Sequence, residues 1–274
     1  MRARWLGQQL REAREARGIA SKNAAQYLER AAGTMSRYES GEYPIRRADL
    51  LALMDLYGVS DAAQRARLFR LREEIWRTDW WDDYAEDVEN RFIDYVWLEQ
   101  RAQQIKVVDN WRVPGLLQHP SYTAAVLDIV DADSDPAQRV RWAELRRTRQ
   151  HVLDREDPPA VQAIVDEAVL YRPIGGPEVM AEQLGHLQAL SARPTITIRV
   201  LPLRAMPDSG IFTIFSLGEP FPADVACVET LIGARFVESP KIQRVLHAYD
   251  RLWAPAQEIG DASGPISKAL KEYT

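Results

Sequence analysis

The chain has 274 residues, a formal net charge of −5 and a single cysteine. This length suits about one to three domains, and one cysteine excludes both a disulfide framework within the chain and a paired-cysteine metal site. No apolar stretch is long enough for a membrane helix and the start lacks a signal-peptide core, so we expect a cytoplasmic protein with no membrane partner.

Charge is distributed unevenly along this sequence. Residues 1–72 carry 14 Lys and Arg against 8 Asp and Glu, whereas residues 73–274 carry 21 against 32. The first part is therefore net basic and the rest is net acidic. This asymmetry is expected when only the first module contacts a polyanion such as nucleic acid.

Residues 1–72 are predicted to form an all-α domain of five helices. The first covers about 6–17, and two short helices with apolar faces follow within 18–41. The second of these short helices covers about 31–39 and presents Thr34, Ser36 and Arg37 outward, while Gly41 ends it with a positive φ. A fourth helix begins near Arg46 and Arg47 and is followed by Gly58. A fifth begins at a capping box, 61–64.

The segments 10–14 (LREAR), 18–19 (GI) and 34–41 (TMSRYESG) resemble the XRE (phage repressor/Cro-like) helix-turn-helix family, over residues 3–72. The resemblance implies a double-stranded DNA operator as partner and a recognition helix near 31–39. It also implies a partly buried ion pair between Arg14 and Glu39. The DNA-binding residues that the resemblance and the outward face together indicate are Ser21, Lys22, Ala32, Gly33, Thr34, Ser36, Arg37, Arg46 and Arg47.

Three positions depart from the family pattern, since Glu29, Arg30 and Ala31 stand where a Gly, an apolar residue and a capping Ser or Thr are usual. Glu29 is therefore expected to adopt the left-handed backbone region at some energetic cost. Losing the cap at Ala31 costs about 1 kcal/mol.

Residues 73–87 are predicted to be an acidic, Trp-rich linker. Between Glu73 and Glu99 lie ten acidic residues and two arginines. These acids and aromatics could bind a basic partner or shield the DNA-binding face in one state. In the alternative interpretation the tryptophans pack the domains together while the acids stay solvated.

Residues 88–274 are predicted to form an α+β domain, so the chain as a whole is α+β. Helices are expected at 88–105, 121–130, 136–155, 177–192, 239–253 and 265–273. Alternating patterns predict a sheet of about four strands, at 160–166, 195–201, 210–217 and 224–230, flanked by these helices.

This second region also carries a resemblance, through 97–99 (WLE), 113–118 (VPGLLQ), 165–170 (VDEAVL) and 200–203 (VLPL). These segments are similar to the C-terminal domain of antitoxin-like XRE regulators, a domain of unknown function. The resemblance implies a small partner protein that antagonises DNA binding. The apolar length of this region, including the helix near Trp97 and the stripe ending at Trp253, favours a homodimer formed through it, and we expect the same domain to sense an effector or partner.

Catalytic motifs are absent from the sequence, so we expect no enzyme, no catalytic residues, no metal and no cofactor. The four histidines lack metal-ligand spacing. Asp166 and Glu167 lie at the end of a predicted strand, where neighbouring side chains point to opposite faces, so the two carboxylates are poorly placed to share one site.

The sequence therefore predicts a sequence-specific transcriptional regulator, a repressor or developmental regulator, associated with the nucleoid when bound to DNA. Its C-terminal domain would sense a small protein or ligand. An antitoxin-like protein that sequesters a small partner and regulates its own operon is the alternative. An enzyme tethered to DNA is a third hypothesis.

Overall fold

The computed structural model describes residues 1–88, 90–205, 210–219, 221, 224–230, 233–259 and 264–273. The chain separates into two compact units. The N-terminal unit comprises residues 1–80 with 219–221, and the C-terminal unit comprises residues 81–218 with 222–274.

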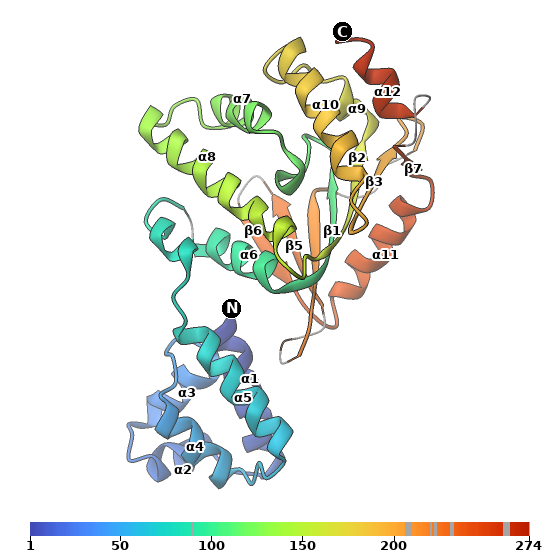
Figure 1. Ribbon diagram of the computed structural model, residues 1–274. Helices are drawn as coiled ribbons and strands as arrows, with labels where there is room; N and C mark the ends of the chain where they lie inside the picture. Colours follow the sequence, from blue (N-terminus) through green and yellow to red (C-terminus); the bar gives the residue numbers. More distant parts are fainter. Residues whose placement is uncertain are drawn as a thin grey trace. The chain divides into compact units, whose positions relative to one another are not determined.

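The N-terminal unit contains five helices within residues 1–76, as the sequence predicts. They are α1 (Arg2–Ala16), α2 (Ser21–Tyr27), α3 (Ala32–Ser40), α4 (Arg47–Leu56) and α5 (Ala62–Trp76) (Figure 1). Their inner faces meet in a core of fully buried side chains that includes Leu6, Leu10, Met35, Leu50 and Leu68. Helix α5 continues to Trp76, so the linker predicted at 73–87 begins inside a helix. A 3-10 turn, Trp80–Tyr84, occupies part of the remaining segment.

Helix α1 crosses α3 at very short range because Gly7 has no side chain. A Cβ atom built on Gly7 would lie 2.3 Å from the carbonyl oxygen of Tyr38 and 2.6 Å from that of Glu39. Real Cβ atoms do not approach backbone so closely. The glycine therefore fixes the distance at which the first helix supports the C-terminal end of α3.

The turns around α3 have the geometry that the sequence predicts. Glu29 takes a positive φ of 54°, and Gly41 ends the helix with a φ of 75°. Ala31 occupies the N-cap position without a side-chain hydrogen bond. Helix α3 therefore begins without a side-chain cap and ends at a glycine with a positive φ, as the sequence predicts.

The C-terminal unit is built on a mixed sheet in which seven strands are described. They are β1 (Ala102–Asp109), β2 (Ala160–Asp166), β3 (Ile196–Leu201), β4 (Phe212–Leu217), β5 (Asp224–Thr230), β6 (Gly233–Val237) and β7 (Gln257–Glu258). Their order is β6-β5-β4-β1-β2-β3-β7. The central strands β1, β2 and β3 run parallel, and the other pairings are antiparallel. The α+β class is confirmed, but the expectation of about four strands was too low.

The largest error concerns β1, which was not predicted and whose first residues, 102–105, were assigned to the end of a helix. Helix α6 (Asn90–Arg101) ends at Arg101, and β1 follows without a turn. Four of the six residues from Trp97 to Ala102 are buried and the other two are half-buried, so periodicity does not mark the change from helix to strand. Strands β6 and β7 lie at the sheet edges and are short, which leaves little pattern to detect.

The helices cover both faces of this sheet. They are α6, α7 (Pro120–Val130), α8 (Pro136–Gln150), α9 (Glu167–Leu170), α10 (Pro177–Ser191), α11 (Ile242–Trp253) and α12 (Pro265–Leu270). Helix α11 packs on a cluster that includes Ile214 of β4. Tyr95 of α6 contacts the next strand residue, Phe215, edge to face at 5.1 Å. Adjacent strand residues point to opposite faces, so α6 and α11 lie on opposite sides of the sheet (Figure 1).

The acidic, aromatic segment is partly built into the C-terminal unit. Trp81 and Trp97 are buried, with exposed fractions of 1% and 0%. The Asp87 carboxylate forms an ion pair with Arg141 and accepts a hydrogen bond from Gln138. Glu89 lies outside the described residues. Burial of these tryptophans favours a packing role for them.

Candidate nucleic-acid interface and C-terminal pocket

Helix α3 presents one exposed face formed by positions separated by helical spacing. Ala32, Gly33, Ser36 and Arg37 are all exposed, and Thr34 is half-buried. The intervening Met35 and Tyr38 are buried in the core. Residues at i, i+1, i+4 and i+5 share a face, so four predicted base-facing positions lie side by side. A Cβ on Gly33 would meet nothing within 4 Å. This exposed face therefore consists of three small residues and one arginine, Arg37.

The Arg37 guanidinium is held by a residue that sequence reasoning missed. Arg37 Nη1 donates a hydrogen bond of 3.1 Å to the Tyr43 hydroxyl, and its Cζ lies 4.9 Å from the Tyr43 ring centroid. The backbone places Tyr43 there, because its N–H donates to the Arg37 carbonyl. No helical or strand periodicity marks Tyr43. Four guanidinium N–H groups stay available to a base or a phosphate.

Residues on α2 and α4 complete the set that the resemblance implies. Lys22, Arg46 and Arg47 are exposed, and Ser21 is half-buried at the first position of α2. The guanidinium of Arg47 stacks on Phe69, with Cζ 4.9 Å from the ring centroid. Arg46 occupies the N-cap position of α4. All these groups are positioned by the starts of short helices.

Arg14 and Glu39 form a bidentate ion pair that joins α1 to α3. Arg14 Nε lies 2.6 Å from Glu39 Oε1, and Nη2 lies 3.0 Å from Oε2. Only 10% and 9% of the two side chains are exposed. Arg14 Nη1 also donates to the carbonyl of Ile19, which begins the approach to α2. One arginine therefore orients the three helices of the motif.

A second buried carboxylate in this unit escaped the sequence analysis. Asp49 of α4 accepts a 2.7 Å hydrogen bond from the Tyr38 hydroxyl and is 3.3 Å from Arg30. Burial and this carboxylate raise the pKa of Tyr38 to about 12. Arg30 stands where the family has an apolar residue. Its pairing with Asp49 explains how the turn tolerates it.

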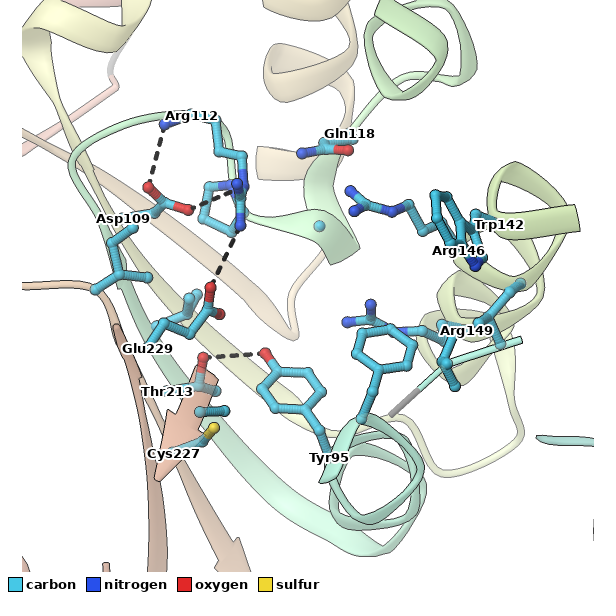
Figure 2. Close-up of a pocket in the computed structure, with 18 of the residues that line it drawn as sticks. Tyr95, Asp109, Arg112, Gln118, Trp142, Arg146, Arg149, Thr213, Cys227 and Glu229 are labelled. Carbon is cyan, nitrogen blue, oxygen red and sulfur yellow. Dashed lines mark hydrogen bonds and ion pairs between the residues drawn. The ribbon is translucent and has the colours of Figure 1, made fainter. Parts of the chain in front are cut away.

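The C-terminal unit contains a cavity of about 630 Å³ (Figure 2). Its walls come from α6, β1, the loop after β1, α8 and the strands β4, β5 and β6. Successive residues of the strands point to opposite faces of the sheet. Val107 and Cys227 face the cavity, whereas Val108 and Ala226 belong to the core cluster on which α11 packs. The cavity is also lined by aromatic, charged and amide side chains, which include Phe92, Tyr95, Asp109, Arg112, Gln118, Trp142, Arg146, Arg149 and Glu229.

One wall of the cavity is fixed by a buried ion pair between α6 and α8. Arg149 Nη2 lies 2.6 Å from Glu99 Oε1, and Nε lies 2.8 Å from Oε2. The exposed fractions of the side chains are 8% and 1%. The guanidinium also lies about 5 Å from the ring centroids of Phe92 and Tyr95. Burial raises the pKa of Glu99, and the charge of Arg149 opposes that shift.

The opposite wall carries a second charged cluster. Arg112 Nη2 lies 3.3 Å from Glu229 Oε2, and its Nε lies 3.7 Å from Asp109 Oδ2. Asp109 also accepts hydrogen bonds from the backbone N–H groups of Trp111 and Arg112. These bonds close the turn after β1. The side chains of Arg146 and Arg149 project from α8 toward this cluster (Figure 2).

Asp109 gives the C-terminal unit an unusual pH dependence. Burial raises the pKa of Asp109 to about 6, although the Trp111 N–H and Arg112 oppose it. The folded unit thus binds an extra proton between about pH 4 and pH 6. The extra proton stabilises the folded unit below pH 4, and this stabilisation is lost as the pH rises from 4 to 6. The unfolding free energy is therefore expected to fall by on the order of 2–3 kcal/mol over that window.

Asp109→Asn keeps an acceptor oxygen for the turn and is expected to remove this pH dependence. Urea unfolding between pH 4 and pH 7 measures the effect. Asp133→Asn, an exposed carboxylate in the same unit, is the matched control and leaves the slope unchanged. A slope that persists in Asp109→Asn contradicts the assignment.

Other reactive side chains of the C-terminal unit are Cys227 and a group around His119. Burial raises the pKa of the Cys227 thiol to about 12. The structure brings His119 and His186 together, with ring centroids 5.6 Å apart, which the sequence did not indicate. Nearby, the Ser121 hydroxyl donates a 2.6 Å hydrogen bond to Glu182 Oε2, and its oxygen lies 2.8 Å from His119 Nδ1. Among the described residues, no cluster of His, Cys, Asp and Glu is placed to hold a metal.

A short helix, a tight turn and a second helix with an exposed cationic face define the helix-turn-helix class. A family model described as a helix-turn-helix domain matches residues 5–68. A second model, described as a domain of unknown function (DUF5753), matches residues 92–267. The chain therefore belongs to the DUF5753 family and carries an N-terminal helix-turn-helix. No curated protein and no solved structure matches it.

These findings make the chain a DNA-binding regulator. The DNA-binding module occupies the basic end of the sequence, as its charge distribution predicts. Within the described residues, no helix has the length and apolar character needed to cross a membrane.

Proposed function

We propose that the chain is a sequence-specific transcriptional regulator, a repressor or developmental regulator, that inserts α3 into the major groove of an operator. The exposed face formed by Ala32, Gly33, Ser36 and Arg37 carries this proposal. A major groove about 12 Å wide admits a helix whose contacting side chains are short. Lys22, Arg46 and Arg47 would contact phosphates on either side.

Arg37 is expected to read a base. Arginine donates bidentately to the O6 and N7 acceptors of guanine, so Arg37→Ala should cost about 1–3 kcal/mol of binding free energy and relax one operator position. Binding of the variant to an operator series mutated one position at a time measures both effects.

Arg37→Lys is the matched control, because it keeps the charge and loses the planar fork. It should retain the salt dependence of binding but not the preference at that position. If Arg37→Ala weakens every sequence equally, Arg37 contacts only phosphate.

The C-terminal unit is proposed to form a homodimer and to receive the signal, from a small ligand or a small partner protein. Ile129, Val130 and Val140 support this role, since these apolar side chains on α7 and α8 are 58–63% exposed. Trp97, which the sequence analysis associated with the dimer surface, is fully buried in the unit's own core. Dimerisation would set the spacing of two recognition helices, about 10–10.5 base pairs or a multiple.

A fragment of residues 1–80 is expected to be monomeric and to bind the operator weakly. The fragment must include Trp76, because its indole N–H donates to the Ile45 carbonyl and ties α5 to the unit. Light scattering measures the oligomeric state, and operator binding across a salt series measures the affinity. The salt dependence of binding per N-terminal unit should be the same in the fragment as in the full chain. A dimeric fragment with full affinity contradicts this division of roles.

We further propose that the chain acts by binding rather than by catalysis. The high pKa of Cys227 keeps it a thiol near neutral pH. The Ser121 hydroxyl donates its one proton to the Glu182 carboxylate, so Ser121 accepts in its 2.8 Å contact with His119 Nδ1. Neither arrangement supplies an activated nucleophile.

A further inference from the structure

Arg146 is a cation without a counter-ion in the cavity of the C-terminal unit. It lines the cavity from α8 and is only partly exposed. The described residues offer it no hydrogen bond and no ion pair. Burial, with the like charges of Arg149 and Arg112, lowers its pKa to about 10. A buried arginine normally finds a bidentate acceptor, because desolvating its charge is costly.

The carboxylates around the cavity are mostly engaged elsewhere. Asp87 pairs with Arg141, and Glu229 and Asp109 pair with Arg112. Asp131 attracts Arg146 electrostatically but forms no ion pair with it. Glu99 neutralises Arg149. Among these cavity arginines, Arg146 is therefore the one that forms no ion pair with a described residue, although Glu229 also attracts it electrostatically.

The rest of the cavity suits a compact organic molecule. A volume of about 630 Å³ lies within the roughly 300–1,000 Å³ typical of small-molecule sites. Phe92, Tyr95 and Trp142 supply aromatic surface to the lining. Such a site offers aromatic surface to the body of a ligand and, in Arg146, a cation that can fix its orientation.

We propose that this cavity binds a small organic anion, whose carboxylate or phosphate pairs with Arg146 while its apolar part packs on Phe92, Tyr95 and Trp142. The anion would be the effector of the regulator, so its regulatory role rests on the proposed function. The guanidinium fork matches either anionic group bidentately.

The experiment uses the full chain without DNA and a charge series of similar shape: benzoate, neutral benzamide and cationic benzamidine, with phenyl phosphate as the phosphate arm. Titration calorimetry and the thermal midpoint report binding. At least one of the two anions should bind at millimolar concentration, and benzamide and benzamidine about tenfold more weakly. Arg146→Gln should weaken anion binding about tenfold.

Arg147→Gln is the matched control, because it removes the same charge from the adjacent, exposed position of α8. It should bind the anions as the unmodified protein does. Equal losses in the two variants, equal binding of benzamide, or no binding of either anion overturns the proposal. Binding of a peptide through its terminal carboxylate, but of neither anion, overturns it in favour of a protein partner.

A ligand-free measurement tests the same idea. Arg146→Met removes a desolvated charge that has no ion pair and keeps an apolar chain in place of the aliphatic stem, so it should raise the thermal midpoint by about 2–4 °C. A lowered midpoint would show that Arg146 supports the fold. Operator binding is measured separately, so loss of anion binding and failure to bind DNA are distinguishable.

Discussion

Replacing Arg14 with Ala is expected to lower the unfolding free energy of the N-terminal unit by about 3–5 kcal/mol. The change removes both bonds to Glu39 and the bond to the Ile19 carbonyl. It also leaves the Glu39 carboxylate, only 9% exposed, without its cation. An unpaired buried charge costs more than the pair contributes, which is why one truncation has so large an effect.

Thermal unfolding of the full chain measures this prediction, and the transition of the N-terminal unit should move while that of the C-terminal unit stays. Arg11→Ala on the same helix is the control. Arg11 pairs with Glu15 in a solvent-exposed i,i+4 contact, and such pairs contribute little. Equal shifts in the two variants would contradict a structural role for the Arg14–Glu39 pair.

Arg149→Met is expected to destabilise the C-terminal unit by a similar amount, about 3–5 kcal/mol. It leaves Glu99 buried among α6 and α8 with no cation. Burial already raises the pKa of Glu99. Without Arg149 the carboxyl should stay protonated to a higher pH. The variant is therefore most stable at low pH and loses stability as the pH rises through the folded-state pKa of Glu99.

The double variant Glu99→Leu/Arg149→Met should recover much of the lost stability, because it removes both charges and fills the space with apolar atoms. Urea unfolding of the single and double variants gives the coupling free energy directly. Arg147→Met, at an exposed position of the same helix, should be nearly neutral. A double variant as unstable as Arg149→Met would show that packing, not charge, dominates at this site.

The helix-turn-helix could be predicted because its determinants are local. Gly41, the apolar positions Met35 and Tyr38, and the signature at 34–41 lie within a few residues of one another. The αL conformation of Glu29 follows from its place in that pattern. Tyr43 and Asp49 were missed, because their roles depend on how the loop and α4 fold back onto α3.

The cavity could not be predicted because its walls are distant in sequence. Helix α8 carries five arginines, and the sequence shows only a basic helix. Arg146 and Arg149 share a face at i,i+3 spacing, but nothing in the sequence says that α6 covers that face. Strand β1, which contributes Val107 and Asp109 to the cavity floor, was not predicted, and its first residues, 102–105, were assigned to the preceding helix.

The strand order also has a consequence for how the chain is made. In the central sheet, Val107 of β1 pairs with Thr213 of β4, so the ladder joins segments more than a hundred residues apart. The N-terminal unit instead consists of helices whose partners follow within a short stretch. Chains with local contacts fold faster than those with distant pairings, and domains emerging from the ribosome fold from the N-terminus. The DNA-binding module is thus expected to be folded during translation, well before the cavity that lies between residues 87 and 234 can close. A nascent chain would be competent for DNA before it is competent for an effector.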